Sequence, residues 1–574
     1  MKRLLRLIFT LAGVVILAGV AQAADIKASG MAGTAVADLR CEYQTDPYGI
    51  DCATPRFSWK INAAERGTQQ KAYQILVAST PELLARNKGD LWDSGKVQSD
   101  QSHLIPYAGK PLSSHQQCFW KVKVWQKGKW RAQWSEAAQW TMAFLSPDEW
   151  QAQWIASTSR KEPLNLDGAK WIWGLRSGET GDTVAPGPCR MSRRFTLPED
   201  VAIEYADLVI TADNSATVTV NGERVATVTD WKRGQPAGVS DLLVSGENVL
   251  EVLAENGSAA PNPAGMICKL EVGMGDGQCL LIVSDNQWQA ARGLAAEEVQ
   301  PAFEIAVWGE GPWEANARID YQTRGLPVFR RTFTVNKALK EARVYVSGLG
   351  HCELFVNARK VGDHFLDAPW SLYEKTAYYN SFDITDYLQE GENEFKIMLG
   401  KGFYNTHGDR RTHSVHRNSE LMARLEARLE YADGETDLVV TDRSWDVAFG
   451  PITHSAILGG SDYDATFADP ERWTKAKTTH TTGLLRSVES PPMKHFERLA
   501  PIKPVEEPEP GVFVYDFGQN MSAVPYITVR GKKGQVVTLI PAEQRHGQTD
   551  RHNNGTGRVN QAGVGAGTRF QYTL

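Results

Sequence analysis

The sequence predicts an all-β protein made of β-sandwich domains in tandem. Apolar and polar residues alternate over short stretches through most of the chain, as they do in half-buried strands, whereas helical periodicity is scarce. The 50 glycines and 27 prolines supply turns between such strands. One pattern of strand-forming segments also recurs at the size of a whole sandwich domain. A single hydrophobic core does not grow to fill a chain of this length, so we expect about three to five domains.

The first 23 residues have the features of a signal peptide. Lys2, Arg3 and Arg6 form a basic segment, an apolar stretch runs from Leu7 to Val20, and Ala21-Gln22-Ala23 offers small residues for cleavage. This stretch is short for a transmembrane helix, which needs about 20 apolar residues, and no other segment approaches that length. We therefore expect a secreted protein, periplasmic or extracellular, without a transmembrane segment in the mature chain.

Composition favours a folded protein with an uncharged ligand. The net charge is only -6 and no long basic run occurs, which gives no reason to expect nucleic acid as a partner. The 18 tryptophans and 17 tyrosines suit the C–H faces of sugars, although core packing accounts for most of them. Seven cysteines include no Cys-x-x-Cys pair. Export leaves disulfides open, with Cys41–Cys52 and Cys268–Cys279 as the near pairs.

Residues 24–146 contain the clearest strands of a first sandwich domain. Tyr73–Ala78 and Trp120–Trp125 alternate in the manner of half-buried strands, and Lys127-Gly128-Lys129 follows as a tight turn. Between them, Pro81–Asn87 predicts a short helix.

Residues 147–323 and 324–484 repeat one pattern and predict two related jelly rolls. In each copy an Arg-Arg strand is followed by a second strand, a hairpin and a Gly-Glu-Asn segment. The hairpin turns, Asn221-Gly222 and Asn357-Ala358, are of the type that takes positive φ. A tryptophan-bearing loop follows each hairpin, and the second copy is longer by a loop insertion. Residues 485–574 predict a further β-sandwich, which we expect to be truncated.

Three sets of motifs are distinctive, one in each of three segments: Trp59, Tyr73, Trp92 and Phe119-Trp120; then Gly348-Leu-Gly350, Phe355-Val-Asn357, Ala368-Pro-Trp370, Phe382-Asp-Ile-Thr385, Gly391-Glu-Asn393 and Leu399–Tyr404; and finally Tyr515–Asn520, Pro541–Glu543, Val559–Gln561 and Phe570–Leu574. These motifs resemble domains of bacterial α-L-rhamnosidases. The first domain resembles the fibronectin-III-like domain that opens many of these enzymes, and the second repeat copy resembles their N-terminal jelly roll. The last segment is similar to the sandwich that precedes their catalytic barrel, which leaves 147–323 as an accessory jelly roll.

The resemblance implies a glycoside hydrolase that removes terminal α-L-rhamnose with inversion, through two glutamates on an (α/α)6 barrel and without a cofactor. The apolar periodicity of such a barrel is missing here, so we expect the catalytic residues beyond Leu574 and assign none. The present segment would supply carbohydrate-binding and scaffold domains for a rhamnose-containing oligosaccharide or glycoside from plants. A stand-alone binding or scaffold protein without activity is the alternative, and a hydrolase acting within the sandwiches is a third.

The insertion in the second jelly roll carries the candidate binding residues. Asp367, Trp370, Tyr373 and Asn380 place an aromatic platform and hydroxyl-binding oxygens close in sequence, which predicts a sugar site. Asp363 and Asp367 are the candidate ligands of a structural or sugar-bridging calcium ion. Related domains of the family bind rhamnose with calcium, but no D-x-D-x-D-G spacing occurs here. The alternative is that Trp370 and Tyr373 cap the core and the aspartates form turns.

Two polar clusters complete the candidates. His407–His416 contains a His413/His416 pair, but no Glu or Cys pattern completes a metal site, so a solvated loop is favoured. Arg545–Asn554 predicts a flexible loop that would border the active-site cleft of a full-length enzyme.

Overall fold

The structure is a computed structural model that describes residues 35–574 apart from several short stretches. The predicted signal peptide, Met1–Ala23, lies outside the described residues. One α-helix accompanies the strands of the described part, which confirms the all-β prediction. None of its helices is long and apolar enough to cross a membrane. The stretches left out are 64, 129–131, 158–163, 200–201, 276–277, 294–298, 314–317, 320–324, 407–409, 411–418, 469, 471–472, 504, 546–557 and 562–566.

The chain forms two compact units. Unit 1 takes the chain up to Asp46 together with Thr54–Pro111 and Gln117–Gln139, and unit 2 takes Pro47–Ala53, Leu112–Gln116 and Trp140–Leu574. The division between the two units therefore does not coincide with the predicted domain boundary after residue 146, because short segments of the first predicted domain belong to unit 2.

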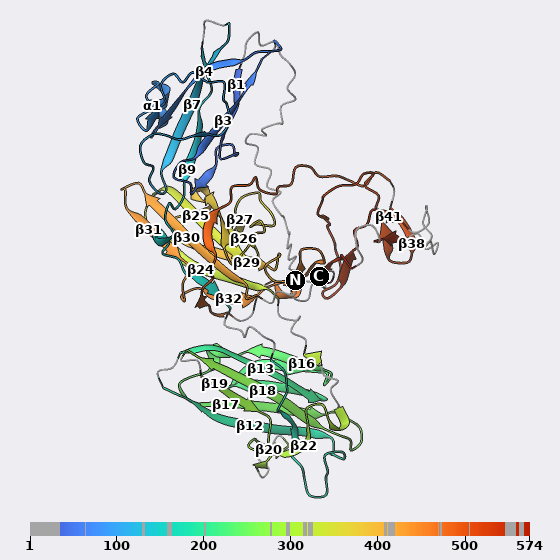
Figure 1. The fold of residues 1–574 in the computed structure, drawn as a ribbon. Coiled ribbons are helices and arrows are strands. Elements are labelled where there is room, and N and C mark those ends of the chain that lie inside the picture. Colours follow the sequence, from blue (N-terminus) through green and yellow to red (C-terminus); the bar gives the residue numbers. More distant parts are fainter. Residues whose placement is uncertain are drawn as a thin grey trace, which may run out of the picture. The chain divides into compact units, whose positions relative to one another are not determined.

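Unit 1 is a small sandwich (Figure 1). Its two sheets meet at aromatic side chains, with the Phe57 and Trp120 rings 4.5 Å apart. Its helix begins after Thr80, whose side chain accepts a hydrogen bond from Leu83 N, and buries Leu84. The predicted strands and helix are thus confirmed. The elements are β1 (Ala35–Cys41), β3 (Arg56–Asn62) and β6 (Ile105–Pro106) in one sheet; β4 (Gln70–Ala78), β5 (Trp92–Asp93), β7 (Gln117–Gln126) and β8 (Gln133–Trp134) in the other; and α1 (Pro81–Ala85).

Unit 2 contains two sandwiches of one topology. The first sandwich has sheet orders β22-β11-β18-β13-β16-β23, with β19 on β18, and β15-β14-β17-β12-β20-β21. Its strands, green in Figure 1, are β11 (Lys170–Trp173), β12 (Gly187–Leu197), β13 (Ile203–Asp213), β14 (Ser215–Val220), β15 (Glu223–Val228), β16 (Arg233–Gly238), β17 (Gly246–Asn256), β18 (Gly265–Met274), β19 (Cys279–Val283), β20 (Gln289–Arg292), β21 (Gln300–Pro301), β22 (Phe303–Val307) and β23 (Arg318–Ile319).

The second sandwich repeats this arrangement strand for strand. Its sheet orders are β36-β10-β30-β25-β28-β37, with β31 on β30, and β27-β26-β29-β24-β32-β35. Even the parallel pair at one edge recurs, as β16–β23 and as β28–β37. Its strands are β10 (Trp154–Ala156), β24 (Pro327–Val335), β25 (Leu339–Leu349), β26 (His351–Val356), β27 (Arg359–Lys360), β28 (Thr376–Asp383), β29 (Gly391–Gly400), β30 (Met422–Tyr431), β31 (Thr436–Val440), β32 (Asp446–Phe449), β35 (Thr474–Lys475), β36 (Lys477–Thr479) and β37 (Leu484–Ser487).

The boundaries of the repeat differ from the predicted ones. β10 pairs with β30 and β36, so residues assigned to 147–323 contribute a strand to the second sandwich. At the other end, β37 carries that sandwich past the predicted boundary at 484. Short strands that complete a sheet from a distant part of the chain carry no periodicity of their own, which is why the sequence could not assign them.

Residues 489–574 pair strands without enclosing a core. Among the described hydrophobic residues of this segment Val514 is the buried one, whereas Phe496 is 91% exposed. β43 (Phe570–Thr573), predicted as a strand, pairs with β40 (Val536–Leu539) and, in parallel, with β34 (Gly460–Asp464). The remaining strands are β33 (Ile452–Ala456), β38 (Glu506–Glu509), β39 (Val512–Val514), β41 (Gln544–Arg545) and β42 (Val559–Asn560).

One asparagine network recurs in both sandwiches. Asn357, at the hairpin turn with φ 50°, donates to Asn393 Oδ1 over 2.8 Å and accepts from Glu394 N. Asn393, only 1% exposed, also accepts from Gln389 N and donates to the carbonyl oxygens of Gln389 and Gly391. The first sandwich contains the same bonds.

Its version joins Asn221, with φ 48°, to the buried Asn248 over 2.8 Å. The predicted positive-φ hairpins are therefore confirmed, and in each copy a side-chain network ties the hairpin to the Gly-Glu-Asn segment.

Replacement of Asn393 by alanine should destabilise the second sandwich by about 2 kcal/mol, because it leaves buried backbone groups without their partner. Scanning calorimetry should show one transition shifted to lower temperature. Glu392→Ala, at an exposed neighbour, is the control and should leave that transition in place. An unchanged transition in Asn393→Ala would contradict the role given to the network.

Candidate functional site

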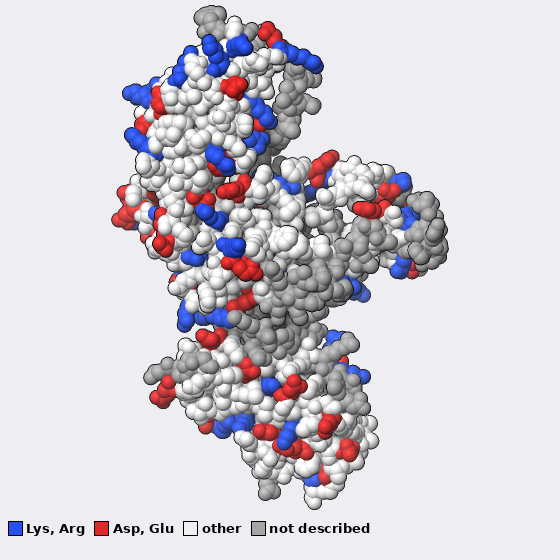
Figure 2. Space-filling view, in the orientation of Figure 1, with Lys and Arg blue, Asp and Glu red and all other residues white. Residues whose placement is uncertain are grey.

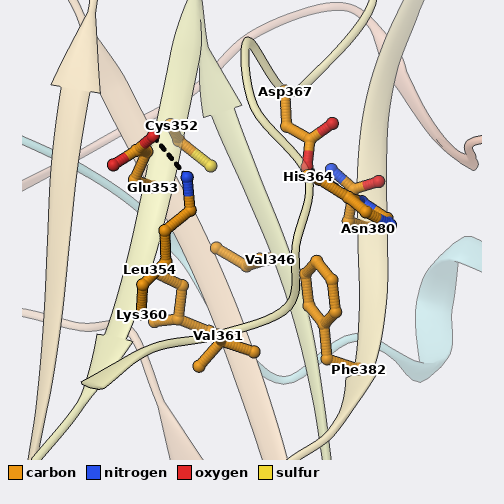
Figure 3. A pocket seen from close by; sticks show the side chains of 10 residues that line it. All are labelled: Val346, Cys352, Glu353, Leu354, Lys360, Val361, His364, Asp367, Asn380 and Phe382. Carbon is orange, nitrogen blue, oxygen red and sulfur yellow. Dashed lines mark hydrogen bonds and ion pairs between the residues drawn. The ribbon is translucent and has the colours of Figure 1, made fainter. Parts of the chain in front are cut away.

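The predicted sugar site lies on the segment between β27 and β28 of the second sandwich. A cavity there has a volume of about 10 Å³, room for roughly one water molecule, so it does not admit a sugar ring. In Figure 3, Asp367, His364 and Asn380 lie together on one side and the Glu353–Lys360 ion pair (2.6 Å) on the other. The lining residues are Val346, Cys352, Glu353, Leu354, Lys360, Val361, His364, Asp367, Asn380 and Phe382.

His364 separates the two carboxylates predicted to bind calcium. Its Nδ1 lies 3.2 Å from Asp367 Oδ2, and its Nε2 lies 3.8 Å from Asp363 Oδ1. The imidazole therefore stands between them. Calcium takes six to eight oxygen ligands around one point, and these two carboxylates do not converge on one. Within the described residues no group of three or more His, Cys, Asp or Glu side chains is arranged to hold a metal ion. Calcium binding stays a prediction that this arrangement does not favour.

The same segment contacts the chain that follows the second sandwich. Asp363 forms an ion pair with Lys494 at 2.9 Å, and Phe365 N donates to Met493 O over 3.1 Å. Burial is the largest single effect and raises the pKa of Asp363. The hydrogen bond and the attraction to Lys494 act against it, and the pKa is lowered overall. Asp363 thus has a structural partner, which the sequence did not indicate because residue 494 lies far along the chain.

The two predicted aromatic residues divide into a surface residue and a core residue. Trp370 is 69% exposed, and its ring lies 4.9 Å from that of Phe403 at an interplanar angle of 30°. Tyr373 is 7% exposed and packs edge-on against Tyr404, with ring centroids 5.1 Å apart. Trp370 therefore remains an aromatic platform open to a ligand, whereas Tyr373 is part of the core, as the alternative had it.

Asn380 and Asp367 are the predicted residues that the fold brings together. Asn380 is 7% exposed on β28, opposite Val346, and lines the cavity with Asp367. His364 and Phe403 were not predicted. The sequence offered one indication of each: His364 lies three residues before Asp367, and Phe403 is an aromatic residue within the Leu399–Tyr404 motif.

The two predicted polar clusters are only partly described, and one arginine of each forms an ion pair. Most of the His407–His416 and Arg545–Asn554 clusters lies outside the described residues. Arg410 forms an ion pair with Asp462, and Arg545 forms one with Glu506 at 2.8 Å. All seven cysteines are described and no disulfide joins them; in the β18–β19 pair, Cys279 lies opposite Gly273 rather than Cys268.

A partly buried histidine adjoins this site. His351, on β26, has a pKa that burial lowers to about 4, while the Asp367 carboxylate opposes this shift. Because the unfolded chain binds the proton more tightly than the fold does, protonation favours unfolding.

Trp370→Ala should leave stability within about 0.5 kcal/mol of the parent, whereas Tyr373→Ala should cost about 3 kcal/mol, since it opens a cavity in the core. Chemical denaturation of the two variants, measured in parallel, tests this. Equal losses in both would show that the division into platform and core is mistaken.

The stability of the second sandwich should fall as pH is lowered from about 6.5 to about 4, by about 3 kcal/mol at most for His351. The pKa of His351 is lower in the folded chain than in the unfolded chain. The neutral imidazole therefore contributes its full stabilisation above this pH window, and this stabilisation is lost as the pH falls through the window. Thermal midpoints across the window should vary less with pH in His351→Gln. Burial also lowers the pKa of His115 to about 4, so some dependence remains. An identical pH profile for the variant would contradict this assignment.

Three family models match the chain in succession. They are the Rha78A-like, N-terminal immunoglobulin domain at residues 36–146, the alpha-L-rhamnosidase N-terminal domain at 337–504, and the bacterial alpha-L-rhamnosidase concanavalin-like domain at 506–574. The first match is of immunoglobulin type, where the sequence had suggested a fibronectin-III-like domain.

Known relatives are longer than this chain. An alpha-L-rhamnosidase of Streptomyces avermitilis is 34% identical over an alignment of 547 residues, which covers 89% of this chain and 51% of the relative. A crystal structure of Streptomyces avermitilis alpha-L-rhamnosidase complexed with L-rhamnose matches 94% of this chain and 54% of its own, with a TM-score of 0.62 and 30% identity. The alpha-L-rhamnosidase of Dictyoglumus thermophilum shares the fold, with a TM-score of 0.56 at 22% identity, over 94% of this chain and 44% of its own. The chain spans about half the length of these relatives, and its three matched domains are domains of bacterial α-L-rhamnosidases that follow one another along the chain.

Proposed function

We propose that this chain is the β-sandwich portion of a secreted enzyme that hydrolyses terminal α-L-rhamnose from plant-derived glycans or glycosides. One observation carries the proposal: three domains of the rhamnosidase family occur in succession, on a chain that covers 51% of a relative 34% identical to it. Inverting hydrolysis uses two carboxyl groups about 6.5 to 9.5 Å apart across the scissile bond. In this proposal they lie beyond Leu574 and need no cofactor.

The sandwiches would hold the substrate and support the catalytic region. Trp370 on Phe403 offers an exposed aromatic face of the kind that packs on the C–H face of a pyranose. The face of the molecule in Figure 2 mixes acidic and basic side chains without a broad area of either sign, which suits an uncharged ligand. Calcium is not needed for such stacking, and its addition should leave sugar binding at Trp370 unchanged.

The test compares this 574-residue chain with a product extended by the region that follows it in the gene. The chain alone should leave an aryl α-L-rhamnoside at the background rate, and the extended product should cleave it with inversion, which NMR of the released sugar reports. In the extended product, Trp370→Ala should retain cleavage of the small substrate.

The alternatives predict other results. A gene that ends with this chain, together with sugar binding but no hydrolysis, would support the stand-alone binding protein. Cleavage by the 574-residue chain, abolished by one Asp or Glu substitution, would instead place the chemistry within the sandwiches. Either result would overturn the proposal.

A further inference from the structure

A second and larger hollow lies in the second sandwich, away from the residues considered above. It is a groove of about 290 Å³ between β24 in one sheet and β30 and β31 in the other. This volume is close to the lower end of ligand pockets, which begin at roughly 300 Å³ and suit a ligand of one or two rings. The lining residues are Arg331, Phe333, Thr334, Leu429, Tyr431, Asp437, Leu438, Val439, Val440, Asp442 and Ser444.

The groove combines apolar contacts with polar groups on its walls. Phe333 is partly exposed in it and stacks at 4.7 Å on the buried Phe395. Arg331 donates to Ser444 O over 3.1 Å, which leaves other N–H groups of its five for a ligand. Tyr431 donates to Asp437 Oδ2 over 2.8 Å, which orients a carboxylate that is otherwise exposed.

The internal repeat provides a comparison for each of these positions. Both copies keep the scaffold: the same tryptophan bonds a strand carbonyl, from Trp288 Nε1 to Val283 O and from Trp445 Nε1 to Val440 O. Both also keep the arginine, because Arg193 donates to Gln287 O as Arg331 donates to Ser444 O.

Three of the lining positions differ in polarity or in side-chain length, and in the second copy each of the three favours an open, polar groove. Strand register aligns Met274 with Tyr431 and Leu280 with Asp437, so the first copy has no hydroxyl–carboxylate pair there. Gln287 aligns with Ser444, and its side chain accepts a hydrogen bond from Arg193, whereas the serine is too short to cover Arg331.

The effect extends to the aromatic residue below. Phe195, which corresponds to Phe333, is 7% exposed and belongs to the first core, whereas Phe333 is accessible from the groove. Since packing demands are the same in two copies of one fold, the differences point to a ligand in the second copy.

Charge and surface together define that ligand. Two carboxylates, those of Asp437 and Asp442, line the groove together with one guanidinium, that of Arg331, so an anionic ligand would be repelled. Carboxylate and guanidinium groups beside an aromatic face suit the hydroxyls and the C–H face of one sugar. We propose that this groove is a second carbohydrate site that holds a single neutral deoxyhexose, rhamnose if the proposed function is right, through Arg331, Asp437 and Phe333.

Isothermal titration calorimetry with methyl α-L-rhamnopyranoside tests the groove, on the whole chain carrying Trp370→Ala so that the loop platform is removed. The parent in this background should bind at millimolar concentrations. Ser444→Gln, which copies the first sandwich and covers Arg331, and Asp437→Leu should each raise the Kd by about tenfold. Gln287→Ser in the first sandwich is the matched control and should leave the Kd unchanged. Thermal midpoints identify any variant that fails to fold.

Two results would overturn the groove: a Trp370→Ala chain that binds no methyl rhamnoside, or groove variants that fold and bind as tightly as their parent. These results are distinct from failure of the proposed function. If the groove variants weaken binding as expected while the extended product never cleaves a rhamnoside, the carbohydrate site in the groove is supported and the proposed enzyme function is contradicted. If the extended product cleaves the rhamnoside while the groove variants bind it as tightly as their parent, only the proposed site in the groove is contradicted.

Discussion

The second sandwich depends on the hydrogen bonds between two asparagines. Asn357 holds a hairpin turn at positive φ, and Asn393 satisfies the backbone of the turn before β29. The hairpin turn before the segment between β27 and β28 is thereby bonded to the turn that follows β28. The segment between β27 and β28 can then depart from the sheet and return without changing the register of the strands around it.

A repeated scaffold explains how one fold carries two different surfaces. The first and second sandwiches keep the asparagine network, the tryptophan bond to a strand carbonyl and the strand order. The two copies differ in side chains that make none of these bonds. The exposed Trp370 and the groove beside Arg331 both occupy such positions, at loops and at a sheet edge.

The C-terminal segment contrasts with the two sandwiches. Its described strands pair with one another and with β34, but they bury little apolar surface. Apolar burial is the main favourable contribution to folding, so this segment gains most of its order from strand pairing and from contacts such as the Tyr463–Tyr572 stack at 5.4 Å. The sandwiches, by contrast, each enclose a continuous core.

Periodicity and local turn chemistry by themselves determined the all-β class, the repeat, the positive-φ hairpins and the short helix, because these depend on neighbours in sequence. Only tertiary structure decided that β10 completes a distant sheet, that Tyr373 is core and Trp370 is surface, and that His364 separates Asp363 from Asp367. Each of these depends on contacts with residues far along the chain or on burial, and alternating patterns carry no record of which distant partner a side chain meets.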